Sequence, residues 1–167
     1  LPEDQSLLDA GEMVADAPLM PNVLSLVPDE EGLTDALQML KDAKQPILIV
    51  GMGVLWCDAA EELVAFAEHL GAPVLTTTKC KGAIPEDHPL RAGCIIGGLI
   101  ERKLINSSDL IVTLGLDGIE LQPKPWPYTL PVLSLASVPN LDAVIPSTME
   151  VIGDLKAVLL SLTNFAP

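Results

Sequence analysis

Short, continuous runs of apolar residues alternate along this chain with segments of helical periodicity. The clearest runs are residues 47–50 and 110–114. The first of them is bounded by Pro46 and Gly51, which is typical of a parallel strand buried on both faces. Strands that alternate with helices need crossover connections and form a parallel sheet covered by helices. We therefore predict an α/β fold, namely a doubly wound, Rossmann-like sheet of six parallel strands in three layers.

The expected elements fill one domain over residues 29–167. Apolar runs predict strands at 47–50, 73–76, 91–93, 110–114, 132–135 and 151–152, and helical spacing predicts helices that begin near residues 29, 58, 97 and 154. Asp58 and Glu61 are spaced like a capping box at the start of the second of these helices. Residues 1–28 contain four prolines and no sustained periodicity, so we expect an extended linker from a preceding N-terminal domain that is missing here.

The charge of the chain excludes two classes of partner. Its 9 basic and 23 acidic residues give a net charge of −14, which leaves no basic surface for nucleic acid and repels an anionic membrane. The longest apolar stretch, residues 46–57, is shorter than the roughly 20 residues needed to span a bilayer. Cys57, Cys80 and Cys94 form no C-x-x-C pair, so free thiols in a reducing cytoplasm are expected.

A doubly wound sheet binds its ligands in the crevice at the carboxyl ends of strands one and four. The residues predicted to line that crevice follow the first, second and fourth strands: Gly51, Gly53 and Val54, then Thr76, Thr77 and Thr78, then Gly115, Leu116 and Asp117. Two glycines after the first strand and hydroxyls after the second could hold the diphosphate of a nucleotide. A tight strand-to-helix turn explains the same glycines without a ligand.

Three features argue against a dinucleotide site of the usual design. Trp56 stands where the third glycine of G-x-G-x-x-G would fall, and no acidic residue ends the second strand. Asp58, placed near the start of the next helix, would repel a pyrophosphate. The loop 76–82, with Lys79 and Lys81, fits either a phosphate site or a polar surface loop.

The remaining motifs nominate no catalytic residue and no metal ligand. Gly115-Leu-Asp117-Gly118 with Asn140 downstream faintly resembles a motif that holds Mg²⁺ and a diphosphate, but one carboxylate and a distant amide favour a turn. No pair of carboxylates and no nucleophile with an adjacent base stands out. Trp126 and Tyr128 lie in the proline-rich loop 122–131, where they either anchor an interface or fold back over their own domain.

Several motifs, in order, resemble the central domain of acetolactate-synthase-like thiamine-diphosphate enzymes. The resemblance extends over residues 30–160, and the segment 81–89 is its most specific part. It is carried by Pro46-Ile-Leu-Ile-Val-Gly-Met-Gly-Val54, Ala59-Ala-Glu-Glu-Leu63, Leu70-Gly-Ala-Pro-Val74, Thr76-Thr-Thr78, Lys81-Gly-Ala-Ile-Pro-Glu-Asp-His-Pro89, Ser108-Asp-Leu-Ile-Val-Thr-Leu-Gly115 and Val151-Ile-Gly-Asp-Leu-Lys156. Leu1-Pro-Glu-Asp4 is similar to the end of the preceding domain in such enzymes.

The resemblance implies a larger parent enzyme, assembled as a homo-oligomer, of which this chain is the non-catalytic scaffold domain. A pyrimidine-binding domain and a diphosphate-binding domain would flank it and hold thiamine diphosphate and Mg²⁺. The parent would act on 2-oxo acids as a carboligase or a decarboxylase, that is, as a transferase or a lyase.

The same resemblance also supplies the alternative function, a module that binds FAD or ADP. The central domain binds FAD in some members of the family, an ADP group in others and no ligand in many. The FAD-binding members usually have an arginine in a G-x-R motif after strand four, where this chain has Gly115-Leu116-Asp117. An aspartate at that position replaces a cation that suits a phosphate with a charge that repels one.

Overall fold

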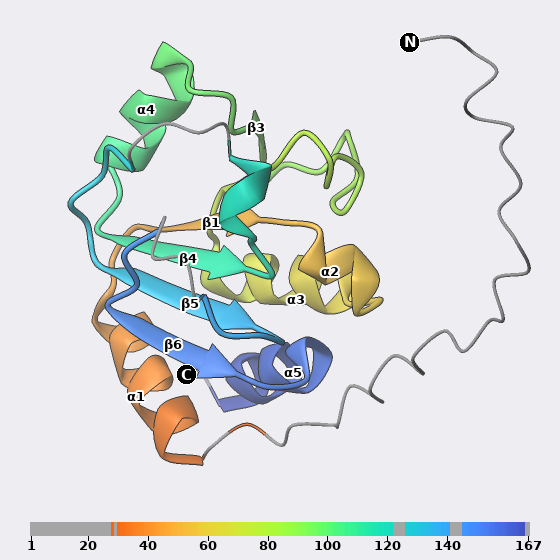
Figure 1. Ribbon diagram of the computed structural model, residues 1–167, viewed down its shortest axis with the longest axis vertical. Helices are drawn as coiled ribbons and strands as arrows, with labels where there is room; N and C mark the ends of the chain where they lie inside the picture. The colour runs from red at the N-terminus through yellow and green to blue at the C-terminus, as the bar shows by residue number, and fades with distance from the viewer. Residues whose placement is uncertain (1–27, 29, 122–125, 141–144, 166–167) are drawn as a thin grey trace, which may run out of the picture.

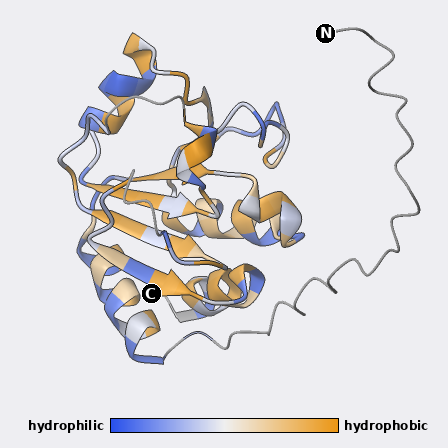
Figure 2. Cartoon of the chain, viewed as in Figure 1, coloured by the Kyte–Doolittle hydropathy of each residue, from blue (hydrophilic) through white to orange (hydrophobic). Residues whose placement is uncertain are grey.

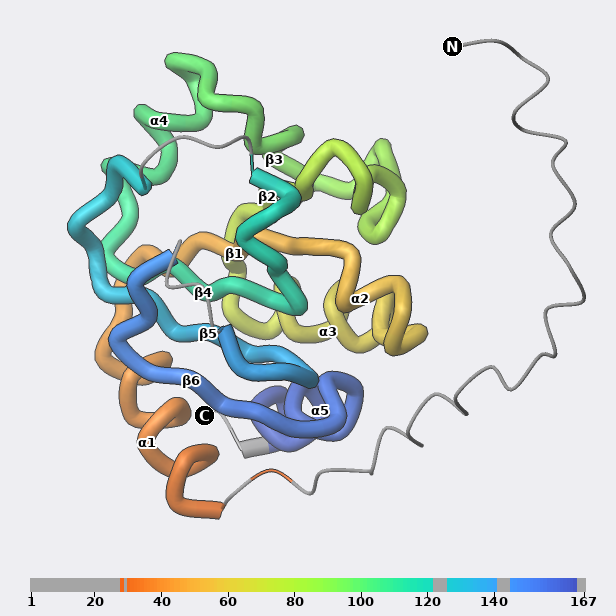
Figure 3. The backbone as a smooth tube through the Cα atoms, in the orientation of Figure 1, coloured from red at the N-terminus to blue at the C-terminus, as the bar shows by residue number. Residues whose placement is uncertain are grey.

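The computed structural model describes residues 28, 30–121, 126–140 and 145–165. In these residues six parallel strands form one sheet with the order β3-β2-β1-β4-β5-β6. The chain moves outward from β1 to β3, crosses back through α4, and then continues from β4 to β6 (Figure 3). The direction of winding therefore reverses between β1 and β4, which confirms the predicted doubly wound α/β fold.

The strands lie close to their predicted positions, and the central ones are apolar runs that the sheet buries on both faces. Their bounds are β1 Pro46–Val50, β2 Val74–Thr76, β3 Arg91–Cys94, β4 Leu110–Leu114, β5 Val132–Ala136 and β6 Met149–Ile152. Every residue of β1, β4 and β5 is buried. Val50 pairs with Leu114, so the two central strands end side by side.

The helices divide the molecule into three unequal layers (Figure 1). Their bounds are α1 Glu30–Asp42, α2 Gly53–Trp56, α3 Ala60–Leu70, α4 Leu99–Asn106 and α5 Leu155–Phe165, with a short 3₁₀ helix, η2, at Gly118–Glu120. Helices α1, α3 and α5 pack against one face of the sheet. The other face is covered by α4 and by loop residues such as Tyr128 and Ile145.

The core follows this division, because alternate strand residues point to opposite faces. Leu48, Val50 and Leu114 pack among the three helices of the thicker layer, against side chains such as Phe66 of α3. Ile47, Ile49 and Ile111 point to the face covered by α4. The strands are coloured as apolar along most of their length in Figure 2. No helix of the described residues is long and apolar enough to cross a membrane.

The start of the second predicted helix differs from the expectation. The chain first forms the short helix α2, and α3 begins at Ala60 with Ala59 at the N-cap and no side-chain hydrogen bond there. The predicted capping pair of Asp58 and Glu61 is therefore wrong. Asp58 instead takes a left-handed conformation, with φ +52°, in the turn between α2 and α3. Tertiary contacts of this turn, described below, outweigh the local capping preference.

Asp109 joins the turn before β1 to the start of β4. Its carboxylate accepts hydrogen bonds from the backbone N–H groups of Lys44 (2.7 Å) and Gln45 (2.9 Å). These donors, the Lys44 N–H first, lower the pKa of Asp109. The contact aligns the beginnings of the two central strands. The expected linker, residues 1–28, lies outside the described residues except for Pro28, as does the first part of the proline-rich loop.

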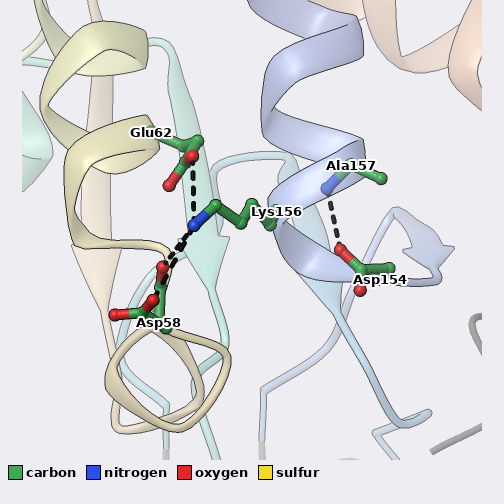
Figure 4. Close-up of polar contacts among 5 residues, drawn as sticks. All are labelled: Asp58, Glu62, Asp154, Lys156 and Ala157. Atoms are coloured by element: carbon green, nitrogen blue, oxygen red, sulfur yellow. Dashed lines mark hydrogen bonds and ion pairs between the residues drawn. The ribbon is translucent and has the colours of Figure 1, made fainter.

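Lys156 connects α5 to the turn that precedes α3 by polar contacts (Figure 4). Its Nζ donates a hydrogen bond to the Asp58 carbonyl oxygen at 3.0 Å and lies 3.4 Å from the Glu62 carboxylate. The side chain of Glu62 is only 12% exposed, whereas that of Asp58 is fully exposed. At the start of α5, Asp154 accepts a hydrogen bond from the Ala157 N–H and so caps the helix.

We predict that Lys156→Met lowers the free energy of unfolding by about 1 kcal/mol, because it leaves the largely buried Glu62 carboxylate without its cation. Urea denaturation of the unmodified chain and of the Lys156→Met variant measures the change in the free energy of unfolding. Lys81→Met is the matched control, because Lys81 pairs with Glu86 at 3.7 Å and both side chains are more than half exposed. Equal losses in the two variants would contradict the prediction.

Candidate functional site

The predicted crevice residues meet where β1 and β4 end. The Gly51 N–H donates to the Leu114 carbonyl at 3.0 Å, and the Gly53 N–H donates to the Gly115 carbonyl at 2.9 Å. The connections that leave the two strands therefore run in contact with each other. The structure brings Gly51, Gly53 and Val54 together with Gly115, Leu116 and Asp117 at this place.

The glycines are required by how closely these two connections approach. A Cβ on Gly53 would lie 2.7 Å from the Gly115 Cα, and a Cβ on Gly115 would lie 2.7 Å from the Gly53 Cα. Gly51 is equally restricted, because its Cβ would lie 2.5 Å from the Leu116 Cα. Such distances leave no room for a side chain. Backbone packing thus accounts for the glycine pattern, and Val54 is fully buried behind it.

The three threonines after β2 separate into different surroundings. Thr77 points into the crevice, where its hydroxyl donates to Glu120 Oε2 at 2.7 Å. Thr76 lies beside β3, with its Oγ1 3.5 Å from the Cys94 sulfur. Thr78 is exposed and lines a neighbouring pocket. The three hydroxyls therefore do not converge on one ligand position.

Asp117 caps η2. Its carboxylate accepts a hydrogen bond from the Ile119 N–H at 2.9 Å, and the Glu120 carboxylate in return accepts one from the Asp117 N–H at 3.2 Å. The two residues form a capping box. Asp117 therefore lies in a capped turn, and the capping box fixes the direction of the Glu120 side chain.

Glu120 occupies the crevice. Its two carboxylate oxygens accept hydrogen bonds from the Met52 N–H at 3.0 and 3.1 Å, and Oε2 also accepts from Thr77. The Met52 N–H lies in the G-x-G turn and belongs to the kind of donor that binds a ligand phosphate at the start of a helix. The crevice therefore contains a carboxylate of the protein where a nucleotide would place an anionic oxygen. These residues do not fit a bound diphosphate.

Sequence reasoning missed Glu120. A local signal for it exists, because an aspartate followed three residues later by a glutamate is the capping-box pattern. That pattern places the glutamate beside its own turn. The contacts with Met52 and Thr77 join residues 68 and 43 positions apart, so they also require the order of the strands in the sheet.

Cys80 lies beneath the crevice and is fully buried. Its thiol donates to the Gly51 carbonyl at 3.1 Å. Burial first, and the Glu120 carboxylate second, raise the pKa of the Cys80 thiol to about 12. Because the thiolate is the reactive form, Cys80 is a structural residue and not a nucleophile. Among the described residues, no group of three or more His, Cys, Asp or Glu side chains could hold a metal ion.

A separate pocket lies beside the crevice, between the β3–α4 connection and the loop after η2. Its volume is about 110 Å³. The large apolar residues that line it are Ile95, Ile96, Leu121, Trp126 and Tyr128, and its polar lining residues are Thr78, Glu101, Arg102 and Glu120. The Trp126 and Tyr128 rings contact edge to face, with their centroids 5.0 Å apart. Tyr128 is buried against its own domain, which agrees with the folded-back alternative for this residue.

The fold is that of a doubly wound domain in which the Glu120 carboxylate lies in the crevice between β1 and β4. Residues 33–162 match the family model described as the central domain of thiamine pyrophosphate enzymes, and the chain belongs to that family.

Two curated relatives show how much of a whole enzyme this chain represents. It is 35% identical over 144 residues to sulfoacetaldehyde acetyltransferase of Alcaligenes xylosoxydans xylosoxydans, covering 81% of this chain and 24% of the relative. It is 39% identical over 90 residues to the acetolactate synthase large subunit of Corynebacterium glutamicum, covering 53% of this chain and 14% of the relative. The chain therefore spans a quarter or less of either protein.

Solved structures share the fold. One is a thiamin-diphosphate-dependent enzyme, described as putative, from Mycobacterium smegmatis, with a TM-score of 0.73, 31% identity, and coverage of 85% of this chain and 29% of that one. Another is benzoylformate decarboxylase from Polynucleobacter necessarius, with a TM-score of 0.70, 27% identity, and coverage of 83% and 27%.

We predict that Gly115→Ala lowers the free energy of unfolding by about 3 kcal/mol, because a left-handed residue acquires a Cβ that collides with backbone atoms. Gly71→Ala is the matched control. Gly71 has φ +59°, close to the +53° of Gly115, but nothing lies within 4 Å of its Cβ position. The control should cost only the conformational strain, about 1 kcal/mol. Similar losses in thermal or urea unfolding would refute the close-approach explanation.

We also predict that iodoacetamide leaves Cys80 unmodified in the native protein at pH 8. With the pKa of the thiol raised to about 12, almost no thiolate is present at that pH. Peptide mass spectrometry measures the rate at each cysteine. Cys57 and Cys94, which are partly exposed, serve as internal references. Alkylation of Cys80 at the rate of Cys94 without prior unfolding would contradict the assignment.

Proposed function

We propose that this chain is the non-catalytic scaffold domain of a larger thiamine-diphosphate-dependent enzyme. It would space and support a pyrimidine-binding domain and a diphosphate-binding domain of the same polypeptide, and those domains would hold the cofactor and Mg²⁺. The observation that carries the proposal is the Glu120 carboxylate, which accepts hydrogen bonds from Met52 and Thr77 in the position of a ligand phosphate. A self-filled crevice suits a domain that supports chemistry performed elsewhere.

The parent would act on 2-oxo acids as a carboligase or decarboxylase. The names of the relatives support a transferase or a lyase, since they include an acetyltransferase, an acetolactate synthase subunit and a decarboxylase, and the decarboxylase is named for a 2-oxo acid, benzoylformate. The parent would form a homo-oligomer in the cytoplasm, where the three free cysteines of this domain stay reduced.

The alternative, an FAD- or ADP-binding module, requires the same N–H donors to be free. A phosphate placed there would meet the Glu120 carboxylate and, close by, Asp117, and like charges in a partly buried site repel strongly. The position that would hold a phosphate-binding arginine is Asp117, whose carboxylate accepts from Ile119 instead. The geometry therefore favours the scaffold function.

The test measures thermal unfolding of the chain with FAD, ADP, coenzyme A, NAD, or thiamine diphosphate with Mg²⁺. We expect no shift in melting temperature with any of them. A ligand at about a hundred times its Kd would add roughly 2.7 kcal/mol of stability, which is readily detected. A saturable shift with FAD or ADP in the unmodified chain would overturn the scaffold proposal.

Glu120→Ala tests the role of the carboxylate in the same assay. Removing it frees the Met52 N–H, so we expect ADP or inorganic pyrophosphate to raise the melting temperature of this variant above its own ligand-free value. Glu150→Ala, on β6 away from the crevice, is the matched control and should show no ligand effect. Ligand shifts of the same size in both variants would mean that Glu120 does not block the site.

A further inference from the structure

Large exposed apolar side chains gather at one edge of the molecule. Among the described residues they are Leu55, Trp56, Ile96, Leu99, Ile100, Ile119, Val138 and Leu160. All except Leu160, which lies on α5, are in the connections that follow the carboxyl ends of strands. The edge that carries the filled crevice is therefore also the apolar edge of the domain.

Three of these residues lie at the start of α4 or just before it. Ile96, Leu99 and Ile100 are 62%, 77% and 85% exposed, and we call these three residues the α4 tip. In Figure 1 this end of α4 projects away from the sheet, and in Figure 2 it is coloured as apolar. Grouped side chains of this size mark an interaction surface more strongly than scattered ones.

The pocket beside the crevice adjoins the α4 tip, because Ile96 belongs to both. Its volume of about 110 Å³ is somewhat below the roughly 150 Å³ of an apolar cavity that holds benzene, so it matches one large aliphatic side chain. Apolar residues surround most of it, and a well-packed pocket that receives one anchoring side chain is typical of interface hot spots.

Local charge indicates what kind of surface would cover the α4 tip. Arg102 and Lys103, in α4, are exposed next to the apolar group, whereas Glu101, the acidic residue of that helix, is only 6% exposed. This part of the surface is therefore basic, although the chain as a whole has a net charge of −14. Two copies that met through this same region would bring like charges together, whereas an acidic partner surface would complement it.

We propose that the α4 tip and its pocket dock a flanking domain of the parent enzyme, which inserts one large apolar side chain into the pocket and places carboxylates near Arg102 and Lys103. The proposal rests on the proposed scaffold function. The length of the parent supports this occupant over an unrelated protein, since the chain spans only 24% of its acetyltransferase relative and 29% of a similar solved chain.

The experiment compares Ile100→Glu in two contexts, the 167-residue chain and the full-length parent enzyme. The side chain is 85% exposed in the isolated domain, so its melting temperature should stay within about 1 °C of the unmodified value. In the parent the new carboxylate would be buried at the docking surface, and we expect a decrease of about 3 °C or more. We expect Leu99→Glu to give the same pair of results as Ile100→Glu.

Leu160→Glu is the matched control, because Leu160 is also exposed, at 47%, but lies on α5 and away from the apolar edge. It should shift the melting temperature equally in both contexts. Equal shifts for Ile100→Glu in the two contexts would overturn the docking proposal. So would a dimer of the 167-residue chain, seen by light scattering, that Ile100→Glu dissociates, because the occupant would then be a second copy.

The two proposals fail in different ways. Ligand binding by the unmodified chain overturns the scaffold function and leaves the comparison of contexts unaffected. Equal melting-temperature shifts for Ile100→Glu in the two contexts overturn the docking proposal and leave the scaffold proposal unaffected.

Discussion

The backbone donors that emerge where β1 ends need an acceptor. A doubly wound sheet leaves N–H groups at this point, and a buried donor without a partner costs free energy. In this chain Glu120 supplies the acceptor for Met52 and for the hydroxyl of Thr77. One carboxylate thus joins the connections after β1, β2 and β4. The closely packed glycines, the buried Cys80 and the capped turn at Asp117 are all arranged around it.

The sheet could be predicted because its signals are local. Residues 47–50 and 110–114 are continuous apolar runs, and both became central strands with nearly the expected bounds. The turn at Asp58 could not be predicted in the same way. Its left-handed backbone coexists with contacts to Lys156, which is 98 residues away, and no window around Asp58 contains that information.

The sequence indicated where in the fold the crevice lies, but not which side chain lies in it. The nine expected residues lie at the ends of the first, second and fourth strands, yet only Thr77 among the three threonines faces the carboxylate. Glu120, whose carboxylate lies in the crevice, comes from a turn whose placement beside the end of β1 depends on the sheet order. Membership of the family does not predict the position of Glu120 either, because a shared fold does not determine which ligand a site accepts.

The beginning of α4 is held by a side chain of its own helix. Glu101, only 6% exposed, accepts hydrogen bonds from the N–H groups of Ile96 and Gly97, and Gly97 takes a left-handed conformation with φ +85°. The loop that presents the apolar side chains is thereby ordered when the domain folds. Its conformational entropy is lost at that stage and not on association, so the projecting end of the helix is a preorganised surface.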